Sequence, residues 1–211
     1  DGRAAARQAH TGDLVNAAEA VSVGSIDEQD IPRPPTGNGE FDRILGGGIV
    51  PGSVVLVGGE PGIGKSTLLL QVANALAARG DKKSKDPKPD DPILYVTSEE
   101  SARQTKLRAS RLGVASSALL VLAETNLERI INQIHKIQPA VVVIDSIQMI
   151  YKPSLPAAPG SVTQLRDCCM ELVYLAKASG VALLLVGHVT KAGTLAGPKI
   201  VEHIVDTVIY F

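Results

Sequence analysis

The stretch that most constrains this chain is Val54–Leu70, which reads VVLVGGEPGIGKSTLLL. An apolar, β-rich run leads into a glycine-rich turn, and the turn opens directly into a helical LLLQVANALAA. The turn matches the pattern G-x-x-x-x-G-K-[ST], with Gly59, Gly64, Lys65 and Ser66 at the fixed positions. Glycines let consecutive backbone N–H groups curl around phosphate oxygens, and the helix points its positive dipole end at the same phosphates. The stretch therefore predicts a binding site for a nucleoside triphosphate.

Roles follow for the residues of this turn. We expect the nucleotide to be bound by Gly59, Glu60, Pro61, Gly62, Ile63, Gly64, Lys65, Ser66 and Thr67. Lys65 can reach the β- and γ-phosphates, which makes it a candidate catalytic residue, and the hydroxyl of Ser66 can ligate Mg²⁺. The alternative is a tight glycine turn that only joins a strand to a helix. Because strand, loop and helix stand in the order that phosphate binding requires, the nucleotide site is favoured.

Composition limits the class of protein further. A chain of 211 residues, 45% of them hydrophobic, can bury the core of one α/β domain. Its 21 basic and 22 acidic residues nearly cancel, so bulk charge neither supports nor excludes a nucleic-acid partner. No apolar run approaches the ~20 residues of a membrane span, and we expect no membrane partner. The adjacent Cys168 and Cys169 indicate helix packing in a reducing compartment rather than a metal site.

Strand and helix patterns alternate along most of the chain. Apolar runs predict strands at 54–57, 93–98, 119–122, 141–144, 181–186 and 207–211. Amphipathic spacing predicts helices at 40–45, 65–79, 101–112, 126–137 and 161–178. The strands read as continuous apolar runs, which is typical of an α/β fold with a mostly parallel central sheet and helices on both faces. In such sheets the chemistry lies at the carboxyl ends of the strands.

The remaining segments have loop composition. Residues 1–36 are rich first in alanine and then in proline, and we expect a tail or linker ahead of a core at 37–211. Residues 80–92 are charged and proline-rich, which predicts a surface loop. Two more loops are expected at 151–160 and 189–199.

Polar residues follow the buried strands at their carboxyl ends. Asp145 follows VVVI and is expected to hold Mg²⁺ opposite Ser66; the alternative is an aspartate that only caps the next segment. Glu99 and Glu100 follow ILYVTS, where a carboxylate can orient or deprotonate the attacking water. Glu99 is the preferred catalytic base and Glu100 the alternative, since one of the two can serve to start the next helix. His188 follows LLLVG and is predicted to sense the γ-phosphate, with a structural role as the alternative.

Basic residues outside the turn are candidates for partner contacts. The helix expected at 101–112 carries Arg103, Lys106, Arg108 and Arg111. They form either an ordinary solvated face or a contact with a neighbouring subunit or nucleic acid. Only two Phe and four Tyr leave little for stacking on bases. Phosphate contacts from the two loops would instead come from Lys152, Lys191 and Lys199.

Several motifs together resemble one family. They read GEFDRILGGGIVPGS, GGEPGIGKSTLLLQVA, YVTSEESARQTKLRASRLG, LAETNLE, VVVIDSIQ, APGSVTQLRD and LLLVGHVTKAGTLAGPKIVEHIVDTVIYF. Over residues 37–211 the chain resembles the ATPase core of the bacterial RadA family, also called Sms, and more distantly RecA and the DnaB-type helicases. The resemblance implies a RecA-like P-loop NTPase fold in a homo-hexameric ring, with ATP bound between subunits. It also implies a DNA repair and recombination motor that binds single-stranded DNA, drives branch migration of recombination intermediates and works with a RecA-type recombinase.

The same resemblance assigns individual residues and shows departures. Glu99 matches the catalytic glutamate, Asp145 the Walker B aspartate and His188 the γ-phosphate sensor, while loops 151–160 and 189–199 match positions that face DNA. The family also carries an N-terminal four-cysteine zinc finger, a Lys-Asn-Arg-Phe-Gly motif and a Lon-protease-like domain, and zinc would belong only to that finger. Because this sequence contains none of the three, we expect a core fragment that binds ATP and Mg²⁺ but hydrolyses ATP slowly.

Source and alternatives stay open at this point. Residues 81–91 look like an insertion relative to typical bacterial members, so the expected compartment is the cytoplasm for a bacterial source and the chloroplast or mitochondrion for a eukaryotic one. Two other functions compete with the motor: a KaiC-like ATP-driven switch that binds protein partners, and a nucleotide-gated DNA clamp. A motor's ATP turnover should rise with single-stranded DNA, unlike that of a switch, and strand displacement would separate a motor from a clamp.

Overall fold

The computed structural model describes Ser22 and residues 33–80, 92–188 and 197–211. Residues 32–211 form one unit, and residues 1–31 belong to another. The charged segment 81–91, Lys191 and most of the expected tail or linker lie outside the described residues. The domain boundary expected between residues 36 and 37 therefore stays a prediction.

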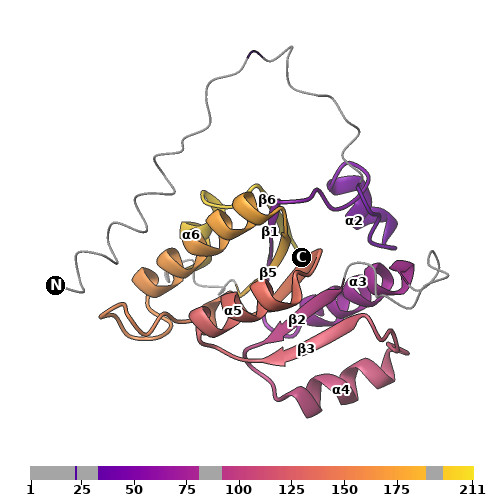
Figure 1. Cartoon of the computed structure of the whole chain (residues 1–211), viewed down its shortest axis with the longest axis horizontal. Coiled ribbons are helices and arrows are strands. Elements are labelled where there is room, and N and C mark those ends of the chain that lie inside the picture. The colour runs from indigo at the N-terminus through magenta and orange to yellow at the C-terminus, as the bar shows by residue number, and fades with distance from the viewer. Residues whose placement is uncertain (1–21, 23–32, 81–91, 189–196) are drawn as a thin grey trace. The chain divides into compact units, whose positions relative to one another are not determined.

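A six-stranded sheet forms the centre of the described domain (Figure 1). Its strands are β1 (Val54–Gly59), β2 (Ile93–Thr97), β3 (Leu119–Ala123), β4 (Val141–Asp145), β5 (Ala182–His188) and β6 (Thr207–Tyr210). They lie in the order β3-β2-β4-β5-β1-β6, and every neighbouring pair is parallel. This arrangement confirms the predicted α/β fold of the RecA-like P-loop class.

Helices cover both faces of this sheet. They are α2 (Gly39–Ile44), α3 (Lys65–Gly80), α4 (Ala102–Arg111), α5 (Leu127–Ile137), α6 (Val162–Ser179) and α7 (Gly197–Glu202), with a short 3₁₀ turn, η2, at Ile147–Met149. α3 and α4 lie on one face, and α5 and α6 lie on the other (Figure 1). Val55 and Val57 of β1 belong to the first core and Val54 and Leu56 to the second, which explains the continuous apolar runs. In the described ranges, no helix is long and apolar enough to cross a membrane.

β3 differs from the central strands because it lies at an edge of the sheet. Leu120 and Val121 are 37% and 39% exposed, whereas every residue of β1, β2 and β4 is buried. An edge strand has a neighbour on one side only, so fewer elements cover its side chains. The side chains of β3 are therefore less buried than its continuous apolar sequence predicts.

The strand register brings several carboxyl ends to one edge of the sheet. Gly59, the last residue of β1, pairs with His188 of β5, and Thr97 of β2 pairs with Asp145 of β4. The glycine-rich turn follows β1 at this edge and leads into α3. Residues far apart in sequence therefore lie beside one loop.

Two further features of α6 bear on the predictions. Cys168 and Cys169 are buried free thiols in this helix, and burial raises the pKa of each to about 12. Their role in helix packing is thereby confirmed.

Gln164 of α6 is also buried, and its side chain hydrogen-bonds backbone groups of Lys152, Leu155 and Ala157. The loop at 151–160 is therefore fixed to α6 by one carboxamide.

Candidate functional site

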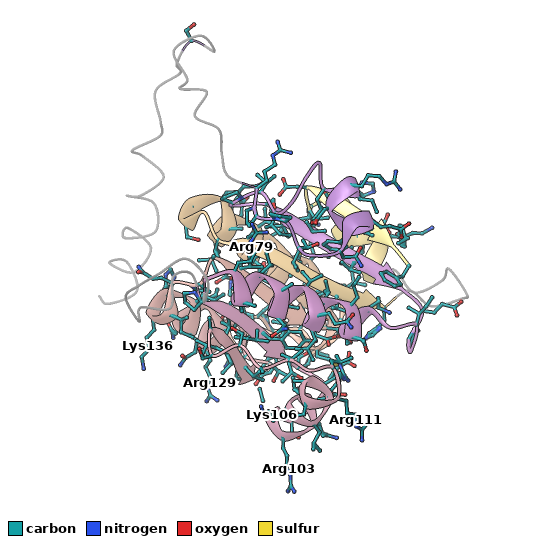
Figure 2. All side chains as sticks on the ribbon, turned by 90° about the vertical axis from the view of Figure 1, so that its right-hand side faces the viewer. Arg79, Arg103, Lys106, Arg111, Arg129 and Lys136 are labelled. Carbon is teal, nitrogen blue, oxygen red and sulfur yellow. The ribbon has the colours of Figure 1, made fainter. Side chains whose placement is uncertain are left out.

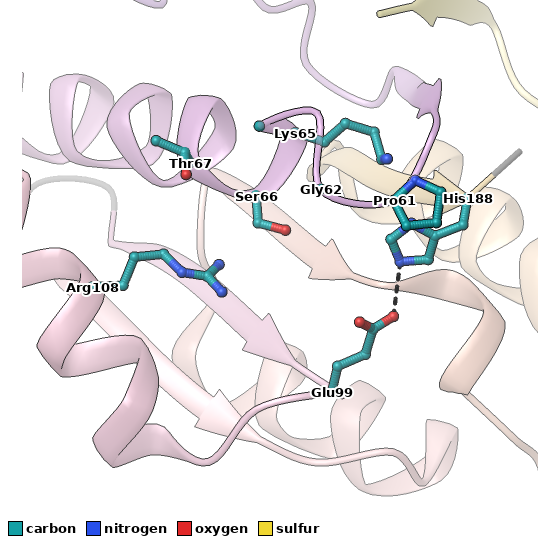
Figure 3. Close-up of a pocket in the computed structure, with 9 residues that line it drawn as sticks. Pro61, Gly62, Lys65, Ser66, Thr67, Glu99, Arg108 and His188 are labelled. Carbon is teal, nitrogen blue, oxygen red and sulfur yellow. Dashed lines mark hydrogen bonds and ion pairs between the residues drawn. The ribbon is translucent and has the colours of Figure 1, made fainter.

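A pocket of about 530 Å³ lies between the glycine-rich turn and the strand ends (Figure 3). It is lined by Pro61, Gly62, Gly64, Lys65, Ser66, Thr67, Glu99, Arg108 and His188. Most residues predicted to bind the nucleotide therefore line one pocket. Gly59, Glu60 and Ile63 belong to the turn but do not line the pocket, and their binding role stays a prediction.

The turn requires glycine most clearly at Gly59. Its φ is +155°, and a Cβ built there would lie 3.1 Å from the Cβ of Phe211 and 3.3 Å from the Phe211 carbonyl oxygen. Gly62 and Gly64 have φ values of +80° and +111°, with no heavy atom within 4 Å of a Cβ built at either position. Positive φ in an open turn lets successive N–H groups converge on an anion.

Replacing Gly59 with alanine is expected to destabilise this turn. The added Cβ would meet Phe211, and the backbone conformation strains any L side chain, so we expect to lose about 1–3 kcal/mol of the free energy of unfolding. Denaturant titration measures this loss. Gly39→Ala is the matched control, because a Cβ at Gly39 has no heavy atom within 4 Å. An equal loss in the two variants would contradict the argument.

Lys65 begins α3 and turns its side chain back over the loop. Its Nζ donates hydrogen bonds to the carbonyl oxygens of Gly59 and Glu60, at 2.8 and 2.7 Å. The residue is 3% exposed, and burial lowers the pKa of its ammonium. The charges of Asp145 and Glu99 act to raise this pKa but do not offset the effect of burial. An ammonium has three donors, so the two carbonyls hold the group in place while one donor remains for a phosphate oxygen.

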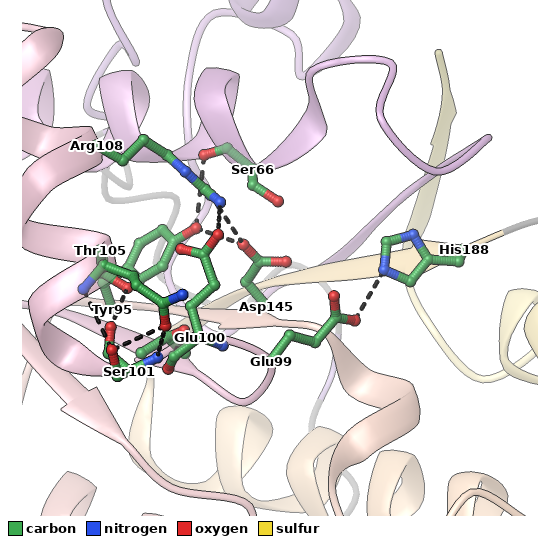
Figure 4. A network of polar contacts seen from close by, with 11 residues as sticks. Ser66, Tyr95, Glu99, Glu100, Ser101, Thr105, Arg108, Asp145 and His188 are labelled. Atoms are coloured by element: carbon green, nitrogen blue, oxygen red, sulfur yellow. Dashed lines mark hydrogen bonds and ion pairs between the residues drawn. The ribbon is translucent and has the colours of Figure 1, made fainter.

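Asp145 is held by a residue that the sequence analysis did not single out. The hydroxyl of Tyr95 on β2 donates to Asp145 Oδ2 at 2.6 Å and lies 3.5 Å from the carbonyl oxygen of Ser66 (Figure 4). Burial, followed by the charge of Asp145, raises the pKa of Tyr95, so its phenol remains a neutral donor. One feature of the sequence could have indicated this contact: Tyr95 is the one tyrosine in an otherwise aliphatic run. A buried hydroxyl needs a hydrogen-bond partner, so a polar group was to be expected beside it.

Glu99 faces His188 across the pocket. Its Oε1 lies 2.9 Å from His188 Nε2 and accepts a hydrogen bond from the hydroxyl of Ser146. Burial acts to raise the pKa of Glu99, but the hydrogen bonds from Ser146 and His188 and the charge of Lys65 outweigh it and leave the pKa below its usual value. Glu99 is therefore a carboxylate at neutral pH. Ser146 is a second residue that the sequence reasoning missed, because its partner is distant in the chain.

Glu100 does not line the pocket, unlike Glu99. Its Oε1 accepts a hydrogen bond from Arg108 Nη2, and the two side chains form an ion pair. Arg108 does line the pocket, and its Nη1 lies 3.9 Å from Asp145 Oδ2 (Figure 4). The other basic residues of α4 point into solvent, namely Arg103, Lys106 and Arg111 (Figure 2). The basic helix therefore has one inward arginine and an otherwise solvated face.

Of the lysines predicted to contact nucleic acid, Lys152 and Lys199 are described by the structure, and neither lines this pocket. Lys152 Nζ pairs with Glu171 at 2.6 Å and with Asp167 at 3.4 Å, and the hydrogen bond to Glu171 is the main reason that its pKa is raised. Lys199 lies on α7, which starts before the end of the loop expected at 189–199. Lys191 lies outside the described residues. Contacts of these lysines with DNA stay predictions.

The residues present fit a nucleoside triphosphate with Mg²⁺. Lys65 and the open backbone at Gly62 and Gly64 offer donors to phosphate oxygens. Ser66 and Asp145 would hold Mg²⁺, which prefers oxygen ligands and, when bound, neutralises phosphate charge. In the part of the chain that the structure describes, no group of three His, Cys, Asp or Glu side chains could hold a metal.

A parallel sheet, a glycine-rich loop between β1 and α3 and carboxylates at the ends of β2 and β4 define a P-loop nucleoside triphosphatase. The chain belongs to the AAA domain family, whose family model matches residues 38–194.

Several similar proteins carry the name DNA repair protein RadA. The one from Bacillus subtilis is 50% identical over 189 residues, which cover 90% of this chain and 39% of that protein. The one from Synechocystis sp. is 48% identical over 209 residues, which cover 91% of this chain and 39% of that protein. The one from Streptococcus pneumoniae is 48% identical over 206 residues, which cover 98% of this chain and 46% of that protein. The resemblance to the bacterial RadA family is thus confirmed, and the chain spans 39–46% of the length of these curated relatives.

Proposed function

We propose that this chain is the ATPase core of an ATP-driven DNA repair and recombination motor. One observation carries the proposal: Lys65, Ser66, Glu99 and His188 come from three separate parts of the chain and line one pocket. Asp145 does not line this pocket, but its Oδ2 lies 3.9 Å from Nη1 of Arg108, which does. The pocket supports ATP as the ligand and Mg²⁺ as its metal. The name shared by the similar proteins supports DNA repair as the process.

The chemistry that the pocket supports is hydrolysis of the terminal phosphate. Such a reaction needs a carboxylate near the attacking water and positive charge near the phosphates. Glu99 is the base, because Ser146 and His188 hold its Oε1 and leave Oε2 to accept a proton from water. Lys65 supplies the positive charge. Glu100 is less suited to the same task because it already forms an ion pair on α4.

The assembly and partners belong to the same proposal. The chain would form a homo-hexameric ring in which segments 151–160 and 189–199 face single-stranded DNA or recombination intermediates. ATP hydrolysis would drive branch migration, and a RecA-type recombinase would be the protein partner. The compartment would be the cytoplasm for a bacterial source and the chloroplast or mitochondrion for a eukaryotic one. The name DNA repair protein RadA, which the similar proteins share, supports DNA as a partner. The ring, the branch migration, the recombinase and the compartment rest on the resemblance in sequence alone.

Steady-state ATP turnover with and without single-stranded DNA tests the proposal. We expect DNA to raise turnover, and the increase to shrink steeply between ~50 and ~200 mM salt because phosphate contacts release counterions. Turnover that ignores DNA at every salt concentration would contradict a motor and point to a switch that binds protein partners. DNA-stimulated turnover without strand displacement would point to a nucleotide-gated clamp.

A further inference from the structure

Arg108 offers more hydrogen-bond donors than the protein uses. A guanidinium has five N–H groups, and among the described residues Arg108 donates one hydrogen bond, to Glu100 Oε1. Its Nη1 lies 3.9 Å from Asp145 Oδ2, which is an ion-pair distance but too long for a hydrogen bond. The side chain is 29% exposed and lines the pocket together with Ser66 and Thr67 (Figure 3). Unused donors therefore face the space that the nucleotide is expected to fill.

The position of this arginine is fixed by its helix. Ser101 and Gln104 form a capping box at the start of α4, in which each side chain accepts a hydrogen bond from the other residue's backbone N–H. Thr105 and Ala109 are the buried residues of the same helix and fix its inward face. A helix anchored at both places directs one basic side chain inward, while the other three remain in solvent (Figure 2).

Charge balance explains why the guanidinium is available to a ligand. Arg108 lies between the carboxylates of Glu100 and Asp145 (Figure 4). Glu100 does not line the pocket, so it neutralises the guanidinium without closing the pocket. Figure 3 shows Arg108 on the side of the pocket away from His188. A polyanion that binds along the turn would therefore pass within reach of Arg108.

We propose that Arg108 binds the phosphates of the nucleotide from within the same chain, and that Glu100 limits this contact by pairing with the same guanidinium. The inference rests on the proposed function, since it needs a nucleotide in this pocket. A guanidinium binds phosphate oxygens directly, so this part of the affinity does not depend on Mg²⁺. Glu100 is then a counter-charge that tunes nucleotide affinity rather than a base.

Calorimetric titration of ADP into the chain in EDTA tests the inference. Arg108→Gln is expected to weaken ADP binding about tenfold, the scale of one charge-assisted hydrogen bond. Glu100→Gln is expected to have the opposite effect and tighten ADP binding roughly threefold, because the neutral amide no longer competes for the guanidinium. If the pair only stabilised α4, loss of either partner would change the affinity in the same direction.

Arg111→Gln is the matched control. It removes the same charge from the same helix, but Arg111 is exposed and does not line the pocket. Equal weakening by Arg108→Gln and Arg111→Gln, or weaker ADP binding by Glu100→Gln, would overturn the inference while leaving the proposed function intact. Failure of the unmodified chain to bind ADP with or without Mg²⁺ would instead overturn the proposed function.

Thermal unfolding of the ligand-free variants checks that α4 remains folded. If Arg108→Gln lowers the melting temperature by more than Arg111→Gln does, Arg108→Lys provides the second test. Lysine keeps the charge but lacks the planar fork, so ADP affinity in EDTA should fall between those of the unmodified chain and Arg108→Gln. An affinity for Arg108→Lys as low as that of Arg108→Gln, in a variant that melts normally, would contradict a charge-based phosphate contact.

Discussion

Lys65→Ala is expected to lower ATP turnover at least about 100-fold and to weaken ATP binding strongly, because the variant loses a preorganised positive charge at the phosphates. The ammonium of Lys65 is held over the turn by two backbone carbonyls and is 3% exposed. Its removal leaves those carbonyls beside an open pocket, where water can bond them. We therefore expect the free energy of unfolding to change by only about 1 kcal/mol. Calorimetry with a non-hydrolysable ATP analogue and Mg²⁺ measures this binding, and thermal unfolding measures stability.

The control for this variant is Lys136→Ala. Lys136 lies in the last turn of α5, is exposed and does not line the pocket. Its side chain points into solvent (Figure 2). The substitution removes the same charge, yet nucleotide affinity and turnover should match those of the unmodified chain. Unchanged ATP affinity in Lys65→Ala would refute the assignment of the glycine-rich turn as a phosphate-binding loop.

Glu99→Gln is expected to slow hydrolysis of bound ATP by about 10²–10⁴-fold, the usual contribution of a general base. Glutamine keeps the length of the side chain and an oxygen that can accept the hydrogen bond from Ser146. It cannot accept a proton from water. ATP binding should remain or become tighter, because a negative charge leaves the neighbourhood of the phosphates. Single-turnover hydrolysis with the protein in excess measures the chemical step separately from affinity.

Glu100→Gln makes the same substitution at the adjacent position and is the natural comparison. Glu100 pairs with Arg108 and does not line the pocket, so its loss should change the chemical step by less than about tenfold. A slow chemical step in Glu100→Gln with a normal one in Glu99→Gln would reverse the assignment of the base. Equal losses in both variants would indicate that neither carboxylate acts alone.

Much of the site could be predicted because its signals are local. Gly59 to Ser66 form a continuous motif, and Glu99, Asp145 and His188 each lie one to three residues after an apolar run. Parallel strands end at one edge of a sheet, so a residue just after such a run is expected there whatever the order of the strands. No such local pattern predicts the contacts of three other residues, Tyr95, Ser146 and Arg108. Each looks ordinary in its own segment, and its partners come from other elements.

The sequence by itself determined the kind of element in most segments, the parallel sheet covered on both faces and the phosphate-binding turn, because apolar spacing and glycine geometry act over a few neighbouring residues. It did not predict α7, whose first residues fall in the loop expected at 189–199. Only the tertiary structure decided which of two adjacent glutamates faces the pocket and which basic residue of α4 turns inward. It also decided that β3 lies at the exposed edge. These outcomes depend on the register of β2 against β4 and on how α4 packs on the sheet. Contacts between distant segments set both, and no local pattern encodes such contacts.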